Sequence, residues 1–316
     1  MLDLLSRNEA DDAAALGASY VAEVRLGVAE AVRRILAVPD EALDYARAKV
    51  ALDRIIDPTI DADAVLAELD RLTECARRLS GPSPSEAAKL AALRTLIYES
   101  GPWNEHRPFA YDHSNFQNIR LKLMSHYLET RLGNCISMPI LFLMLADRLG
   151  LNVALSMAPN HMLLRFTNEG GRTINLEATS GANPARDAWY REIMPMSDRS
   201  VGSGLYLRTL SRRESVAFMG TTVMEDLKIK RRHREVAAVC EIILGHNARC
   251  GMTLANLGAA YGRIIMAEFL ERYRSTFLIP LPLRAQYLLL LQRSDAAFAA
   301  AEALGWEPAA LDKPKQ

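Results

Sequence analysis

The sequence predicts an α+β fold in which a central helix packs on a short antiparallel sheet, between helical N-terminal and C-terminal regions. Apolar residues recur at helical spacing through most of the first hundred residues. Short alternating segments separated by tight turns follow, and helical spacing then returns. We therefore expect three regions: a helical N-terminal region over 1–100, an α+β core over 101–213 and a helical tail over 214–316.

The composition is that of a protein with a packed core. Hydrophobic residues make up 50% and charged residues 24% of the 316 residues. The 38 basic and 38 acidic residues balance, which argues against a nucleic-acid partner. One basic run, Lys228–Arg234, is interpreted as a solvated helix face, with a phosphate or partner site as the alternative. The start lacks the pattern of a signal peptide and the longest apolar run is too short to span a membrane, so we expect a cytoplasmic protein without a membrane partner.

Capping signals and apolar spacing predict the N-terminal helices, which are expected over 13–37, 40–56 and 57–79. Cap signals from Ser83 to Ser85 precede a further helix. Residues 101–118 have no periodicity and are expected to form a structured loop. The next helix, over 121–132, is expected to stop at Gly133, with this glycine as a left-handed cap residue.

The stretch RLGNCISMPILFLM begins the predicted core. Asn134 can cap a helix from about Cys135 to Leu149, which is apolar nearly all round and is therefore expected at the centre of the fold. Three strands are then expected in NVALSM, HMLLRF and RTINLEA, and the turns between them favour an antiparallel meander.

The remainder of the chain is mixed and polar after Gly181 and helical from about residue 214. Residues 237–273 predict a helical hairpin, and residues 283–305 predict a last helix. The spacing of small residues in LANLGAAYGRI is typical of stacked helix pairs.

Four cysteines at wide spacings indicate free thiols in a reducing compartment: Cys75, Cys135, Cys240 and Cys250. Cys240 and Cys250 fall in the predicted tail helices and are interpreted as packing residues. Cys135 differs from them, because it is expected at the N-terminus of the buried helix. There the unpaired N–H groups and the helix dipole favour a thiolate.

A histidine and a carboxylate can meet beside Cys135. His161 opens the second predicted strand and Glu177 ends the third, and neighbouring strands lie about 5 Å apart. A histidine can take the proton of a thiol, and a carboxylate can orient the imidazole. Asn175 shares a strand face with Glu177 and is the alternative orienter. The competing interpretation is structural: an inert core thiol, a hydrogen-bonded core histidine and a carboxylate at a strand end.

Acyl transfer also needs preorganised donors for an oxyanion. The candidates are the backbone N–H at the start of the buried helix and the side chains of Asn134, Gln117, Asn118 and Tyr127. We expect no metal and no organic cofactor, because the three candidate catalytic residues lack the short spacing of zinc ligands and the chain has no EF-hand-like loop.

The segment GNCISMPILFLMLADRLGLNVALSMAPNHMLLRF, together with INLEATSG, resembles the transglutaminase-like core of the papain-like cysteine superfamily. It is most similar to a bacterial branch with a helical region before the core and a tetratricopeptide-like tail after it. GPWNEHRPFAYD and ALDYARAKVALDRIIDP also resemble this branch, so the resemblance spans roughly residues 40–220. It implies a triad of Cys135, His161 and Glu177, with Glu177 in place of the aspartate that is usual in the family.

The resemblance implies two functional hypotheses, because this superfamily includes cross-linkers, amide hydrolases, peptidases and inactive forms. The first is a cysteine acyl-transfer enzyme, hydrolytic rather than cross-linking, that acts on a protein or peptide. The second is a catalytically inactive scaffold that binds a protein partner through its helical tail. The second hypothesis rests on the substitution at Glu177 and on the neighbours Met138, Met157 and Met162, since methionines near a groove suit adaptable binding.

Overall fold

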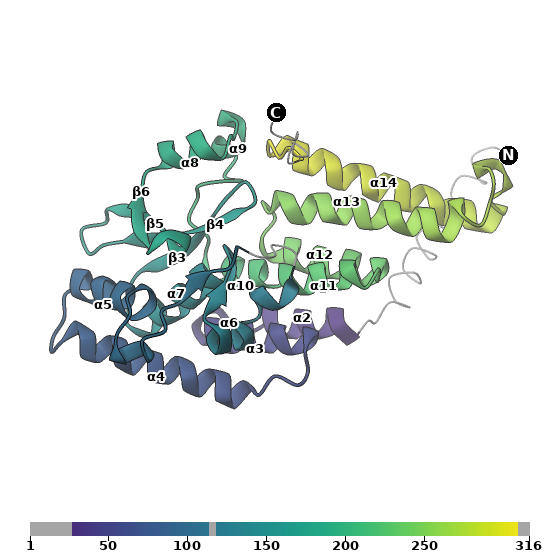
Figure 1. The fold of residues 1–316 in the computed structure, drawn as a ribbon. Coiled ribbons are helices and arrows are strands. Elements are labelled where there is room, and N and C mark those ends of the chain that lie inside the picture. Colours follow the sequence, from purple (N-terminus) through teal and green to yellow (C-terminus); the bar gives the residue numbers. More distant parts are fainter. Residues whose placement is uncertain (1–26, 114–117, 309–316) are drawn as a thin grey trace.

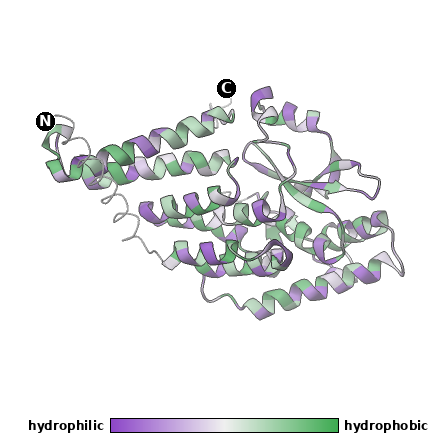
Figure 2. Ribbon diagram, turned by 180° about the vertical axis from the view of Figure 1, so that it is seen from behind, coloured by the Kyte–Doolittle hydropathy of each residue, from purple (hydrophilic) through white to green (hydrophobic). Residues whose placement is uncertain are grey.

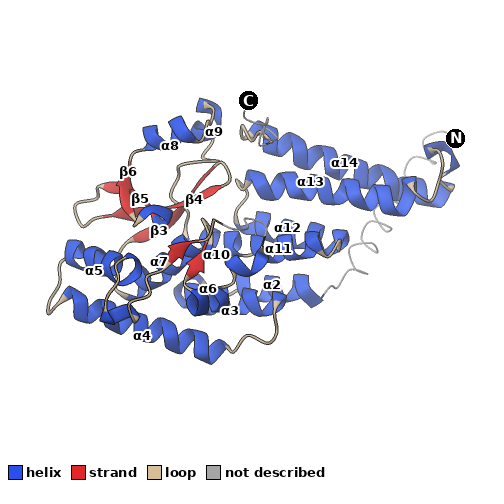
Figure 3. Ribbon diagram, in the orientation of Figure 1, coloured by secondary structure: helices blue, strands red, loops and turns tan. Residues whose placement is uncertain are grey.

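Figure 1 shows the computed structural model, which describes residues 27–113 and 118–308. The sheet lies at one end of the molecule, and the long helices of the tail extend away from it. The predicted α+β class is confirmed, since helices surround a small antiparallel sheet (Figure 3). The part of the first expected helix over 13–26 lies outside the described residues. In the described ranges, no helix combines the length and the apolar composition needed to cross a membrane.

The N-terminal helices begin where side chains accept hydrogen bonds from the first backbone N–H groups. Asp44, Asp61 and Ser85 each accept such a bond from an N–H two or three residues later. The cap signal at Ser85 is therefore confirmed. The helices are α2 (Gly27–Leu36), α3 (Tyr45–Ile56), α4 (Ala62–Ser80) and α5 (Glu86–Tyr98), with short 3₁₀ turns η1 (Asp40–Ala42) and η2 (Pro102–Asn104).

The central helix α7 (Ser137–Arg148) is buried as predicted. Every residue from Ser137 to Ala146 is buried, and helices α3, α4, α5 and α6 (Met124–Thr130) pack around it together with the sheet. Its helical conformation begins two residues later than expected, because Cys135 and Ile136 form a turn that leads into it. The apolar surface on all sides of α7 thus explains its position between the N-terminal helices and the sheet.

The sheet is the expected antiparallel meander, with one additional strand. The strands lie in sequence order: β3 (Val153–Ala158), β4 (His161–Thr167), β5 (Thr173–Glu177) and β6 (Asn183–Ala185). β6 falls in the stretch that was expected to be mixed and polar. It has only three residues and contains Pro184, which strands accept at an edge where no N–H is needed for a further neighbour.

The segment 101–118 was expected to be a loop, but Ala110–Tyr111 form strand β1. This strand runs parallel to β2 (Leu132–Gly133), and Tyr111 pairs with Gly133. A strand of two residues shows no alternation in the sequence, so its pattern gives no signal. The pairing places Tyr111 beside the chain that enters α7.

The helix expected over 121–132 divides into η3 (Ile119–Lys122) and α6, and Gly133 is not its cap residue. The residue with left-handed conformation is Arg131, with φ 62°. Its guanidinium lies 4.3 Å from the centre of the Phe109 ring, which holds it in place. Gly133 is needed because the backbone there passes close to the ring of Tyr127. A Cβ at this position would lie 2.5 Å from that ring.

The tail forms the predicted helical hairpin and last helix. Helix α12 packs on α13, α13 packs on α14, and α2 packs on α12, so N-terminal and C-terminal segments lie side by side. Hydrophilic and hydrophobic residues alternate along these helices, as the view from behind in Figure 2 shows. The elements after the sheet are α8 (Asp187–Ile193), α9 (Asp198–Gly202), α10 (Arg212–Met219), α11 (Thr221–Ile229), α12 (His233–His246), α13 (Gly251–Ile265), the π-helical turn η5 (Met266–Leu270), η6 (Thr276–Leu278) and α14 (Leu281–Ala303).

The basic run Lys228–Arg234 lies at the surface around the α11–α12 turn. Lys230 pairs with Asp226, Arg232 pairs with Glu235 and Arg234 pairs with Glu268. Because acidic neighbours meet these charges, the interpretation as a solvated helix face is supported.

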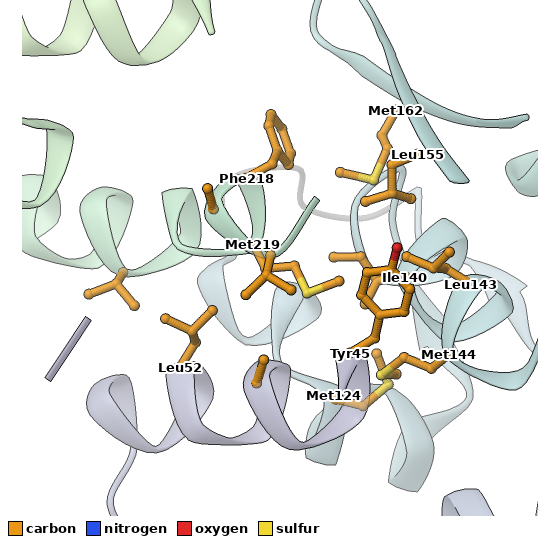
Figure 4. Packing of buried hydrophobic residues seen from close by; sticks show 14 of the residues in the cluster. Tyr45, Leu52, Met124, Ile140, Leu143, Met144, Leu155, Met162, Phe218 and Met219 are labelled. Carbon is orange, nitrogen blue, oxygen red and sulfur yellow. The ribbon is translucent and has the colours of Figure 1, made fainter. Parts of the chain in front are cut away.

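The hydrophobic core is continuous from the N-terminal helices to the tail. Figure 4 shows that side chains of α3, α7, α10 and the sheet converge on one region: Tyr45, Leu52, Ile140, Met144, Leu155, Phe218 and Met219. The transition from sheet to tail is therefore packed into the same core as the central helix.

A buried ion pair ties α3 to the segment that leads into α6. Lys49 and Asp53 are 0% and 1% exposed, and Lys49 Nζ lies 2.5 Å from Asp53 Oδ1. Lys49 also donates to the backbone carbonyl of Lys122, and the backbone N–H of Met124 donates to Asp53. Burial raises the pKa of Asp53, and Lys49 opposes this change. The positive charge of Lys49 and the negative charge of Asp53 thus compensate each other for the loss of water.

We predict that Lys49→Met lowers the free energy of unfolding by about 3–5 kcal/mol, because it leaves the carboxylate of Asp53 buried without its cation. The double variant Lys49→Met/Asp53→Leu should be much more stable than Lys49→Met, since no buried charge remains. Urea unfolding of both variants and the unchanged protein measures the difference. Equal stability of the single and double variants would contradict the account.

Candidate functional site

Cys135 lies in the turn that leads into α7, and Asn134 and Ser137 shape this turn. The side-chain oxygen of Asn134 accepts hydrogen bonds from the backbone N–H groups of Ile136 and Ser137, at 2.9 and 3.2 Å. The hydroxyl of Ser137 accepts a bond in return from the backbone N–H of Asn134 at 3.0 Å. This reciprocal arrangement has the hydrogen-bond pattern of a capping box, but it closes the turn before α7, whose N-cap residue is Ile136. The side chain of Asn134 thus caps the turn that leads into the predicted helix, and its oxygen is engaged there.

The capping leaves Cys135 half-buried with its thiol facing the sheet. Its Sγ lies 3.9 Å from the backbone oxygen of Asn160, the residue just before β4. Within the described residues, the backbone N–H of Cys135 has no acceptor. An unpaired N–H at the start of a buried helix is a donor for an anion that develops next to the thiol.

His161 and Glu177 meet across the β4–β5 pair, as the meander predicts. His161 Nε2 lies 2.8 Å from Glu177 Oε2, and the imidazole is also close enough to the side chain of Cys135 for the two groups to interact. Since Glu177 holds Nε2, the other ring nitrogen is left for the thiol. The structure thus brings the three predicted catalytic residues together in the order thiol, imidazole, carboxylate.

The carboxylate of Glu177 is buried and fully engaged. Besides His161, Glu177 Oε2 accepts a bond from the hydroxyl of Tyr190 at 2.8 Å. Its Oε1 accepts bonds from the backbone N–H and the hydroxyl of Thr179, at 2.9 and 2.5 Å. These bonds offset the cost of placing a carboxylate that is 4% exposed inside the protein. They also fix the orientation of the carboxylate toward the imidazole.

The contacts shift both titrating groups toward their charged forms. Burial disfavours the imidazolium, but the hydrogen bonds to Cys135 and Glu177 outweigh it and raise the pKa of His161 to about 9. Burial also acts to raise the pKa of Glu177, but its bonds to His161 and Thr179 outweigh this and lower it. At neutral pH the pair is therefore an imidazolium bonded to a carboxylate.

Three residues of this arrangement were missed in the sequence analysis. Thr179 lies within INLEATSG and was given no role, although its bond to Glu177 is similar to that of an Asx-turn, in which an acidic side chain accepts from the residue two positions later. Tyr190 and Tyr111 carried no local signal, because α8 and β1 bring them in from distant positions. Tyr111 lines the cavity with Cys135, and burial, followed by its interaction with the Cys135 thiol, raises the pKa of the Tyr111 hydroxyl.

A cavity of about 470 Å³ opens beside Cys135 and His161. The core domain contributes Tyr111, Met157 and Asn160 to its wall, and the tail contributes Arg249 and Trp306. Its volume is in the range of sites that bind small ligands or short peptide segments. The thiol is therefore reachable from a cavity, which a purely structural cysteine does not require.

The other predicted site residues have different surroundings. Asn175 donates to Asp187 at 2.6 Å, and its side-chain oxygen is buried without a partner, so Glu177 is the residue that contacts the imidazole. Tyr127 is completely buried against Phe109 and does not line the cavity. Asn118 caps η3 through the backbone N–H of Arg120. Gln117 lies outside the described residues.

The remaining cysteines and methionines separate into core and cavity residues. Cys240 is a packing residue, and burial raises its pKa. Cys250 is also buried in the core, as interpreted, and it additionally lines the cavity just before α13. Met138 and Met162 belong to the core, whereas Met157 lines the cavity. Within 27–113 and 118–308, no three His, Cys, Asp or Glu side chains are grouped as metal ligands.

A comparison with known families gives a match that runs from α4 to α9. Residues 63–200 match the family model of the transglutaminase-like superfamily. No curated protein matches the sequence. A crystal structure of menin, which reveals a binding site for the Mixed Lineage Leukemia protein, is similar with a TM-score of 0.47 and 14% identity over 88% of this chain and 69% of the menin chain. So distant a likeness carries no functional argument. Residues 63–200 therefore form a transglutaminase-like domain, with further helices before and after it.

Proposed function

We propose that this protein is a cysteine acyl-transfer enzyme that hydrolyses an amide or peptide bond. The observation that carries the proposal is that Cys135 and His161 lie together at the wall of a cavity, with Glu177 hydrogen-bonded to the imidazole behind it. A core thiol with a structural role needs neither a charged imidazole beside it nor a buried carboxylate behind that imidazole.

The proposed reaction proceeds through a thioester. The thiolate of Cys135 attacks the amide carbon, and the carbonyl oxygen becomes an oxyanion. The backbone N–H of Cys135 and the hydroxyl of Tyr111 are the donors that we assign to this oxyanion. The imidazolium of His161 then gives its proton to the leaving amine as the carbon–nitrogen bond breaks. Glu177 stays ionised and keeps the imidazole oriented.

We propose water as the acceptor of the acyl group. The imidazole of His161, neutral after the first step, takes a proton from water, and the resulting hydroxide attacks the thioester carbon. The carbon–sulfur bond breaks, the product acid leaves and the thiolate–imidazolium pair is restored. Asn160 and Arg249 are exposed at the cavity, which supports access of water to the thioester.

Incubation with a peptide library in H₂¹⁸O tests the chemistry and its acceptor. We expect an acyl group on the Cys135 peptide by mass spectrometry, and one ¹⁸O atom in each product carboxylate. Cys135→Ser should form no acyl-enzyme and no product. Cys75→Ser, which removes a thiol of α4 away from the cavity, should behave like the unchanged protein. Product formation by Cys135→Ser would exclude the proposed nucleophile, and amine transfer without ¹⁸O would exclude hydrolysis.

A second prediction concerns the pH at which His161 loses its proton. Because its pKa is raised to about 9, the imidazolium should persist through neutral pH, and acylation should decline as pH rises through about 9. Glu177→Gln removes the negative partner of the imidazolium, so the pKa should fall and the decline should move to lower pH. NMR titration of the His161 ring and pH profiles of acylation measure both.

The matched control for this prediction is Glu192→Gln, which removes an exposed carboxylate from α8. It should leave the titration of His161 unchanged. If Glu177→Gln titrates like the unchanged protein, then the carboxylate does not stabilise the imidazolium and the assigned role of Glu177 is wrong.

The second candidate is a scaffold that binds a protein partner through its tail. Apolar side chains at the far end of the tail favour it: Phe277 and Leu281 are 85% and 76% exposed. This function would be independent of the thiol, so partner binding would survive Cys135→Ser and be lost in Phe277→Ser/Leu281→Ser. Acylation by the latter variant at the rate of the unchanged protein would show that the two functions are separable.

A further inference from the structure

The tail closes the cavity opposite the core domain, and its end is fixed there by hydrogen bonds. The hydroxyl of Ser203 donates to the carbonyl of Leu304 at 2.7 Å, and Arg199 Nε donates to the carbonyl of Ala303 at 3.1 Å. Gly305 then turns with φ +81° directly against the backbone of Ser200. These contacts join the end of α14 to α9. They hold the following residue, Trp306, at the cavity wall.

Two arginines of this wall lie together over Gly204. A Cβ at Gly204 would lie 3.0 Å from Arg208 Cδ and 3.1 Å from Arg249 Nη1, so both arginine side chains pass close to this backbone. The φ of +77° at this position also favours glycine. Arg208 is saturated: it donates to the backbone oxygen of Gly204, to both carboxylate oxygens of Glu214 and to Asn247. It therefore has little capacity left for a ligand.

Arg249 differs from the other cations of the cavity. Lys122 is paired with Glu225, and the imidazolium of His161 is paired with Glu177. Arg249, in the turn between α12 and α13, has no acceptor and no ion-pair partner in the part of the chain that the structure describes. A guanidinium offers several N–H donors in a planar fork that fits a carboxylate.

The wall near Arg249 is apolar. Leu205, Phe218 and Trp306 line the cavity together with Leu210 of the segment that runs along β3. An apolar surface beside a single unpaired cation complements a ligand that has an apolar group and a negative charge.

We propose that Arg249 is a specificity-determining residue of the acyl-transfer site and binds a carboxylate of the substrate. The substrate class is then a peptide or amide whose apolar side chain lies against Leu205, Phe218 and Trp306 while its reacting carbonyl lies at Cys135. This assignment rests on the proposed function. It makes the helical tail part of the substrate site, since both Arg249 and Trp306 follow residue 214.

Matched alkylating probes test the assignment without knowledge of the substrate. N-iodoacetyl-leucine and N-iodoacetyl-leucinamide share the reactive group and the apolar side chain, and they differ in the carboxylate. The rate of Cys135 alkylation by each probe is measured on the full-length protein by mass spectrometry, and the ratio of acid to amide gives the preference for a carboxylate. Activation of the thiol by His161 is the same for both probes and cancels in the ratio. A change in the ratio therefore measures the contribution of Arg249.

We expect Arg249→Gln to lower the acid-to-amide ratio at least about threefold, because one exposed ion pair is lost. We also expect added salt to lower this ratio in the unchanged protein, because salt screens the ion pair. Arg263→Gln, which removes an exposed cation from the far part of α13, should leave the ratio unchanged. An unchanged ratio in Arg249→Gln, with rapid alkylation by the leucinamide probe, would overturn the role of Arg249 and leave the nucleophile intact. No alkylation of Cys135 by either probe would overturn both.

Discussion

The arrangement of the site depends on the buried carboxylate of Glu177. A carboxylate removed from water is costly unless hydrogen bonds and an opposite charge compensate it. Thr179 and Tyr190 supply the hydrogen bonds, and His161 supplies the charge. The same compensation that keeps Glu177 ionised keeps the imidazole protonated, because each charge stabilises the other. The orientation of the imidazole toward Cys135 follows from this pair.

The site also depends on parts of the chain outside the sheet and the central helix. The pairing of β1 with β2 brings Tyr111 to the thiol, and this pairing needs Gly133 where the chain passes the ring of Tyr127. The buried pair of Lys49 and Asp53 holds α3 against the start of α6, just upstream of β2. The tail completes the opposite side of the cavity. The helical regions therefore act on the site through packing and through direct contact with the cavity.

Features with a local signal could be predicted from the sequence, and features set by distant contacts could not. The all-round apolar character of residues 137–146 predicts the buried helix, and alternation with tight turns predicts β3, β4 and β5. That topology also accounts for the meeting of His161 with Glu177. In contrast, β1 and β6 are too short to alternate. Helix α6 ends at a left-handed Arg131 whose guanidinium lies over Phe109, and helix propensity gives no signal for such an end.

The residues of the cavity wall also could not be identified from the sequence. Arg249 is one of many arginines in the sequence. It is distinguished by having no partner among the described residues, whereas Arg208 and Lys122 each have one. Cys250 fits the spacing of a packing residue but lies where the turn before α13 meets the cavity. Such distinctions depend on which side chains the fold brings together. They are absent from the spacing of residues along the chain.

The central claim is that His161 activates the thiol of Cys135, and the rate of Cys135 alkylation by iodoacetamide at pH 7 tests it most directly. The comparison is between the unchanged protein, His161→Ala and the thiol control Cys75→Ser. We predict that His161→Ala lowers the rate about tenfold or more, because the thiolate loses its cationic partner, while Cys75→Ser has no effect. Equal rates in all three proteins would contradict the claim and identify Cys135 as an ordinary thiol of the core.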